Sequence, residues 1–176
     1  MNRRNSIKVL AAGGLVAGVG GYRWLTKSRE HPALAVDVAL TQLKAIDLAQ
    51  IQTTGAWEAS RTFEHLAQSI EFSMAGFPEM KSELFRKTAG QLAFSVFQAR
   101  GRMSHGLDAE IPGEVVAPSF PDPELSRARL IDSLEQFDAF DGALKPHFAY
   151  GELSKSDYAL AHVMHINNHM EEFSLS

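Results

Sequence analysis

The chain has 176 residues, 45% of them hydrophobic, which is typical of one globular domain with a short extension and too apolar for general disorder. It contains no cysteine, which excludes disulfides, thiolate metal sites and cysteine nucleophiles. The net charge is -4, but residues 1–30 hold six basic residues and one acidic residue, which leaves a net charge of -9 in residues 31–176. An acidic domain repels nucleic-acid backbones, so we expect no nucleic-acid partner.

Residues 1–31 have the layout of an export signal, because a basic start is followed by a short apolar run, Val9–Gly21. The Arg3-Arg4 pair resembles a twin-arginine (Tat) signal, although Ser6 stands where that pattern has Phe. The apolar run is shorter than the roughly 20 residues that span a membrane. We therefore expect an export signal or an uncleaved anchor, with a cytoplasmic protein carrying a basic leader as the alternative.

The place of cleavage is open. Ala33-Leu34-Ala35 has the small-x-small form of a cleavage site, but it lies farther from the apolar run than is usual. If the signal is used, the protein is periplasmic or is tethered to the inner membrane of a bacterium by its N-terminus. The membrane would then be contacted only through residues 1–31.

Helical periodicity predicts three helices in the first part of the domain, at about 32–46, 57–74 and 79–103. Gly76-Phe77-Pro78 is a stop signal after the second helix. Residues 104–122 are rich in proline and glycine, with a short β-like Val115-Val116, and predict a long surface crossover.

Two more helices follow the crossover. One begins after Pro123 and runs to about Phe140, and the last begins after Ser154 and extends to about Phe173. Ser154 and Asp157 form a capping pattern at the start of the last helix. Helices of this length with these connections predict that residues 32–176 form an all-α, antiparallel four-helix bundle.

The last predicted helix carries three histidines, His162, His165 and His169, which fall on one stripe within roughly 60° of one another. This stripe borders the apolar face of the helix. Histidines at positions i and i+4 lie one turn apart and can bind one metal ion together, which is the spacing of His165 and His169. A third ligand must then come from another helix.

The second predicted helix offers that ligand, because His65 lies at the edge of its apolar face. If the two helices are neighbours, three imidazoles can converge on one site. Three histidines with a water molecule are a common catalytic geometry for zinc. The alternative interpretation is that these histidines are simply hydrogen-bonded beside the core. Glu64, Glu71 and Glu172 are conceivable acid or base partners, but we expect them to be solvated helix charges.

The stretches Trp57 to Pro78 and His147 to Phe173 resemble the DinB-like (DinB/YfiT) superfamily of metal-binding four-helix bundles, and in particular a branch known only as a domain of unknown function. The resemblance covers roughly residues 34–173. It implies that His65, His165 and His169 bind a divalent metal. His162 is then an extra residue, either behind the ligands or in place of one of them.

The resemblance also carries expectations about chemistry. Some members are transferases or isomerases that depend on a low-molecular-weight thiol, and many have no known activity. We therefore expect a divalent metal, zinc or nickel, and a thiol or another small molecule as partner, with a homodimer as a further expectation. Whether the protein is an enzyme stays open. The alternatives are an exported bundle that binds metal or ligand without turnover, and a structural bundle without metal.

Overall fold

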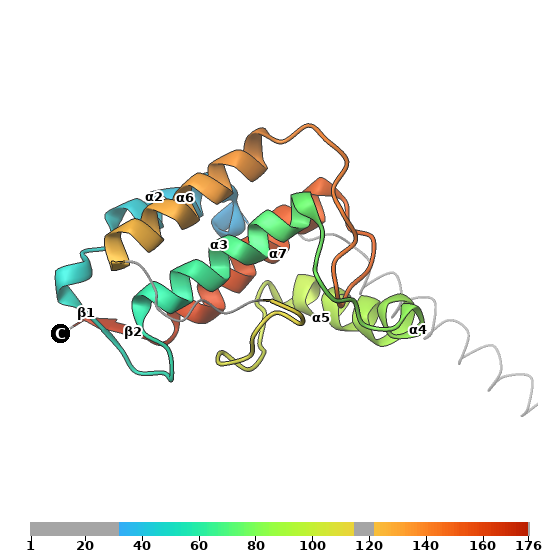
Figure 1. Ribbon diagram of the computed structural model, residues 1–176, viewed down its shortest axis with the longest axis horizontal. Helices are drawn as coiled ribbons and strands as arrows, with labels where there is room; N and C mark the ends of the chain where they lie inside the picture. Colours follow the sequence, from blue (N-terminus) through green and yellow to red (C-terminus); the bar gives the residue numbers. More distant parts are fainter. Residues whose placement is uncertain (1–31, 115–121, 176) are drawn as a thin grey trace, which may run out of the picture.

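The computed structural model describes residues 32–114 and 122–175 of the chain (Figure 1). The predicted signal or anchor, residues 1–31, and Val115-Val116 lie outside the described residues. Within the described ranges, no helix combines the length and the apolar character needed to cross a membrane.

Four helices form the bundle: α2 (Val36–Ala45), α3 (Ala59–Ala75), α6 (Pro123–Ala139) and α7 (Lys155–Met170). Local signals set their ends. Asp122 accepts a hydrogen bond from the Glu124 N–H at the start of α6. The predicted Ser154 capping box is present at the start of α7. The core of the bundle is formed by fully buried apolar side chains of all four helices, among them Leu43, Phe63, Leu66, Leu130, Leu134, Phe137, Tyr158 and Val163.

The prediction of a strictly antiparallel bundle is wrong for one pair of neighbours. Helices α3 and α6 lie side by side and run in the same direction, while α2 and α7 run the opposite way (Figure 1). The segment after α6 returns to the end of α3, where the Lys145 N–H donates to the Ser73 carbonyl at 2.8 Å. The connection between α3 and α6 is long enough to bring the chain back to the end of the bundle where α3 begins. Helix α6 can therefore start beside the start of α3 and run parallel to it.

A fifth helical segment lies beside the bundle and consists of α4 (Glu83–Phe85), a π-helical turn η3 (Arg86–Gly90) and α5 (Gln91–Arg100) (Figure 1). It is shorter than the predicted helix at 79–103. Phe94 packs against Ala161 of α7, which attaches this segment to the bundle. The outer side is solvent-exposed, and Leu84 on it is 75% exposed.

A small antiparallel sheet corrects the all-α prediction. Strand β1 (Ile51–Thr53) pairs with β2 (Phe173–Leu175), and Thr53 lies opposite Phe173. The last helix therefore ends at Met170, three residues before the predicted Phe173, because the chain leaves the helix to join the sheet. Short 3-10 turns occupy Pro32–Leu34 (η1) and Leu48–Gln50 (η2).

Candidate metal centre

Three histidines meet between α3 and α7. The Nε2 atom of His165 lies 3.4 Å from Nε2 of His65 and 3.2 Å from Nε2 of His169. The three ligand atoms lie within 4.8 Å of one another. Helix α3 supplies His65, and α7 supplies the other two from successive turns. The structure therefore brings together the three residues that the sequence singled out as ligands.

The spacing fits a tetrahedral metal ion. Zinc–imidazole bonds of about 2.0–2.1 Å at tetrahedral angles place two nitrogens about 3.3–3.4 Å apart. The observed separations of 3.4 and 3.2 Å agree with that geometry. The outer Nδ1 atoms of His65 and His169 are buried and have no hydrogen-bond partner among the described residues. If those atoms carry the protons, three nitrogen lone pairs face one another, an arrangement that a cation would stabilise.

Burial keeps these imidazoles neutral, as metal ligands must be. Burial, with the neighbouring His105 and Arg61, lowers the pKa of His65 to about 4. Burial and the charges of His65 and His105 lower the pKa of His169 to about 3. Burial and the surrounding histidines also hold the pKa of His165 well below its ordinary value. At neutral pH, all three nitrogens can therefore offer a lone pair.

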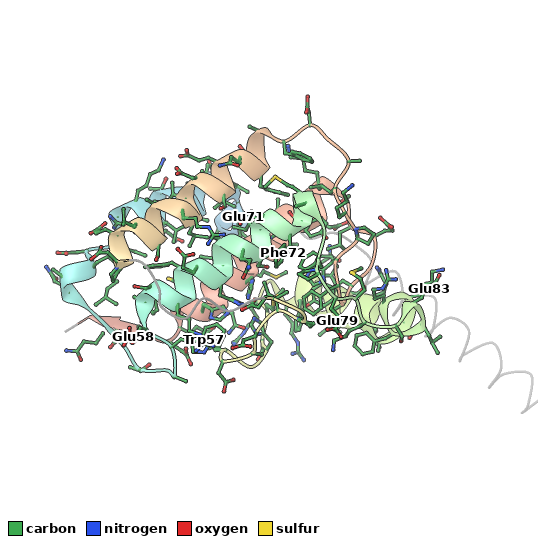
Figure 2. All side chains as sticks on the ribbon, viewed as in Figure 1. Trp57, Glu58, Glu71, Phe72, Glu79 and Glu83 are labelled. Atoms are coloured by element: carbon green, nitrogen blue, oxygen red, sulfur yellow. The ribbon has the colours of Figure 1, made fainter. Side chains whose placement is uncertain are left out.

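Trp57, just before α3, forms one wall of the centre (Figure 2). Its ring is 5% exposed, stacks on His169 with ring centroids 6.0 Å apart, and meets His65 edge-on at 5.0 Å. The Arg61 guanidinium covers the ring at 4.4 Å from its centroid and pairs with Glu110 at 2.7 Å. This arrangement fixes the planes of two imidazoles and shields them from solvent.

His105 is a fourth histidine at the centre that sequence reasoning missed. Its ring centroid lies 4.9 Å from that of His165 and 5.3 Å from that of His169. Its Nδ1 lies 2.8 Å from the Gly106 carbonyl oxygen, so Nδ1 carries the proton and Nε2 keeps its lone pair. That Nε2 is buried and has no partner among the described residues. The described part of the predicted surface crossover thus covers the centre, and its apolar Ile111, which is buried, was the signal in the sequence against a surface loop.

His162 lies outside the three-nitrogen group. Its Nε2 is 3.2 Å from the Ser73 hydroxyl, which in turn donates to the Ile70 carbonyl at 2.6 Å. The Ser73 oxygen therefore accepts from His162, and Nε2 of His162 carries its proton. Burial lowers the pKa of His162 to about 3. His162 therefore lies behind the centre, and its hydrogen bond to Ser73 holds α7 against α3.

Two of the three acidic residues considered as acid or base partners, Glu64 and Glu71, lie away from the centre. Glu64 and Glu71 both pair with Arg129 of α6, and Glu71 also accepts from the Ser133 hydroxyl at 2.9 Å. Figure 2 shows Glu71 on the side of α3 that faces α6. These two carboxylates therefore join α3 to its parallel neighbour and do not face the histidines.

A cavity of about 260 Å³ opens beside the centre. His65, His105 and His165 line one part of it, and His147, Tyr150 and His162 line another. Between them lie mostly apolar side chains of the crossover and of α7, including Met103, Ile111 and Ala161. A volume of this size accommodates a molecule of few heavy atoms, smaller than a drug-sized ligand.

Comparison with known proteins gives one family match. No curated protein and no solved structure matches the chain at a significant level. One family model matches residues 26–175, which is almost the whole chain. Its description is "Protein of unknown function (DUF1569)". The matched range includes all of the residues that build the histidine centre and the cavity, and the chain therefore belongs to the DUF1569 family.

Proposed function

We propose that this protein binds one divalent metal ion through the Nε2 atoms of His65, His165 and His169. The observation that carries the proposal is the convergence of three neutral imidazole nitrogens at the separations of a tetrahedral site. Imidazole nitrogen suits zinc and nickel. With no cysteine in the chain, a softer thiolate site is not available. The proposed ion is therefore zinc or nickel.

We further propose that the centre serves chemistry on a small molecule, with a low-molecular-weight thiol as partner. Three protein ligands leave one coordination position for a thiol or a water molecule. When bound, the ion would lower the pKa of that group and so supply an anionic nucleophile at neutral pH. Trp57 and Met103 exclude bulk water from the centre, and the unpaired Nε2 of His105 can accept a hydrogen bond. The adjacent cavity supports this function over a purely structural site.

Metal analysis of the purified protein tests the binding proposal. We expect about one divalent ion per chain in the wild type, and loss of that ion in His65→Ala and His169→Ala. His162→Asn is the matched control on α7, and it should keep the ion because its Nε2 is committed to Ser73. Equal metal content in the wild type and in the His65 and His169 variants would sink the proposal.

An activity screen with thiols tests the chemistry. We expect a thiol-dependent product whose formation stops when a chelator removes the ion and returns when the ion is restored. Product formation that survives removal of the ion would contradict this role. Retained metal without any thiol-dependent product would favour the alternative, a bundle that binds metal or ligand without turnover.

Two further proposals rest on the sequence. We propose that the domain is a DinB-like bundle, since its helices and its three histidines follow the arrangement that the resemblance implies. An experimental structure with a different helix order would contradict this relation.

We also propose that residues 1–31 direct export or tether the protein to the inner membrane. Lysine at both Arg3 and Arg4 should then hold the protein in the cytoplasm in cell fractionation, and unchanged distribution would exclude a twin-arginine signal.

A further inference from the structure

The second end of the cavity is built by a five-residue turn, His147–Gly151, that the three-histidine centre does not explain. Two backbone hydrogen bonds close the turn, from His147 N to Gly151 O at 2.8 Å and from Gly151 N to His147 O at 3.0 Å. Gly151 has φ +76°, a conformation that favours glycine. Reciprocal bonds and a glycine at this position make the turn a rigid element.

The helical segment beside the bundle holds this turn from outside. The Lys81 N–H donates to the Phe148 carbonyl at 3.0 Å, and the Gln91 side chain donates to the Tyr150 carbonyl. The backbone of Gly90, at the end of the π-helical turn, lies so close that an added Cβ would be 1.9 Å from the Ala149 carbonyl oxygen. The irregular helix therefore fits the turn closely, and π-helical turns often occur at functional sites.

The turn presents His147 as a fixed hydrogen-bond donor. Nδ1 of His147 accepts from the N–H groups of Ala149 at 3.1 Å and Tyr150 at 3.2 Å, so the ring proton is on Nε2. The Tyr150 ring stacks on the imidazole with centroids 4.3 Å apart and an interplanar angle of 7°, which fixes its plane. Burial and the nearby His162 lower its pKa to about 3, so the ring is neutral. Nε2–H has no acceptor among the described residues, and His147 lines the cavity.

The charges around the cavity favour an anion. Lys81 lines the cavity; its ammonium group lies 5.6 Å from the centre of the Phe85 ring, and none of the ion pairs among the described residues neutralises it. The carboxylate of Glu110 also lines the cavity, but it pairs with Arg61 at 2.7 Å. Neutral imidazole ligands would themselves offset none of the charge of a divalent ion, and one nearby carboxylate, Glu114 at 3.9 Å from Nδ1 of His65, would offset only part of it. An anionic ligand would therefore be attracted both by the Lys81 ammonium group and by the metal ion.

We propose that the cavity binds a small organic acid, whose carboxylate is held by Lys81 and by Nε2–H of His147 while its other end reaches the metal centre. This proposal rests on the proposed metal function and names the substrate class for the same site. One cation and one neutral donor match the two oxygens of a monoanionic carboxylate. The cavity volume, about 260 Å³, lies just below the range of drug-sized ligand pockets, so it suits a small acid. His147 and Lys81 are binding residues for the acid and do not ligate the metal.

Binding of simple thiols to the cobalt-loaded protein tests the proposal. The probes are mercaptoacetate, mercaptopropionate and mercaptobutyrate, each compared with the mercaptoalcohol of the same chain length. The thiolate-to-cobalt absorption band reports occupancy of the metal end for every probe, so the acid and the alcohol differ only at the far end. We expect at least one acid to bind about tenfold more tightly than its alcohol.

Variants test which residues cause the tighter binding of the acid. Lys81→Met and His147→Phe should each reduce the preference for the acid to about threefold or less. Lys87→Met is the matched control, because Lys87 pairs with Glu83 on the exposed side of the same helical segment, and it should keep the full preference. Lys81 is solvent-exposed, so Lys81→Met decides the question even if His147→Phe does not fold.

Two results would overturn the proposal: equal binding of acids and alcohols at all three chain lengths, or a full preference for the acid that Lys81→Met retains. The spectrum of the cobalt-loaded wild type separates this failure from failure of the metal proposal. A protein that takes up no cobalt contradicts the metal site itself. A protein that shows tetrahedral cobalt bands without any preference contradicts only the acid-binding role.

Discussion

At the scale of single residues, Glu114 is the carboxylate placed to orient a proposed metal ligand. Nδ1 of His65 is buried without a hydrogen-bond partner among the described residues, and Oε2 of Glu114 lies 3.9 Å away. The Glu114 side chain is 7% exposed, and burial raises its pKa. The same Oε2 accepts a hydrogen bond from the Ile111 N–H at 3.0 Å, so its contact with Nδ1 of His65 is electrostatic and is not a hydrogen bond. A carboxylate at this place favours a proton on the outer nitrogen and leaves the inner nitrogen free to bind metal.

Removal of this carboxylate should weaken metal binding without abolishing it. We expect Glu114→Ala to lower the affinity for zinc by about 10–100-fold, and Glu114→Gln to lower it less, because the amide oxygen still accepts a hydrogen bond. Competition with a colorimetric chelator measures the affinity. Glu135→Ala is the control, since Glu135 pairs with Lys44 and lines no part of the cavity. Equal affinities in the Glu114 and Glu135 variants would show that Glu114 does not orient His65.

At the scale of elements, the contact between the π-helical turn and the His147–Gly151 turn depends on Gly90. Glycine inside a helix ordinarily costs stability relative to alanine, by roughly 0.5–1 kcal/mol. Here the helix lies against backbone, and an added Cβ would meet the Ala149 carbonyl oxygen at 1.9 Å. Backbone atoms of a closed turn cannot move aside as a flexible side chain can. Close packing of two elements therefore outweighs helix propensity at this position.

Gly90→Ala should therefore destabilise the protein, although alanine is the better helix former. We expect the free energy of unfolding to fall by about 2 kcal/mol, a size typical of overpacking. Chemical denaturation measures this change. Gly106→Ala is the control, because the nearest atom to its Cβ would be 3.5 Å away, an ordinary contact, and it should change stability little. A Gly90→Ala variant at least as stable as the wild type would show that the π-helical turn can move away from the His147–Gly151 turn without loss of stability.

At the scale of the whole molecule, the protein buries an unusual number of neutral histidines. His65, His147, His162 and His169 have pKa values lowered to about 3 or 4, mainly by burial, and the pKa of His165 is lowered as well. In the unfolded chain, each titrates near 6.5. As the pH falls below 6.5, the unfolded state binds protons before the folded state does. The free energy of unfolding must then decrease.

The metal-free protein should accordingly lose stability steeply between about pH 6.5 and pH 4. Each proton bound only by the unfolded state contributes about 1.4 kcal/mol per pH unit, so several histidines acting together should exceed that slope. Glu114, with its raised pKa, contributes in the opposite direction and reduces the net uptake by up to one proton. Denaturant melts at several pH values measure the slope, and His162→Asn should reduce it. A flat profile in this range would show that the histidines are not buried as neutral groups.

Local sequence signals predicted the helices because they act over a few residues. The capping box at Ser154 and the proline at Pro123 mark two helix starts correctly, and the pairing of His165 with His169 follows from one turn of helix. The direction of α6 relative to α3 was not predictable in this way. It depends on the path of the long connection between them, which has no periodic pattern.

The amino-acid sequence by itself determined the helical class, four of the helix starts to within a few residues, and a histidine pair that could serve one metal ion. Only the tertiary structure decided that His65 joins that pair, that His105 and Trp57 close around it, and that His147 and Lys81 line the far end of its cavity. The physical reason is the distance along the chain over which each signal acts. Periodicity and capping depend on neighbours within one or two turns, whereas a site depends on packing between segments that lie a hundred residues or more apart in the chain.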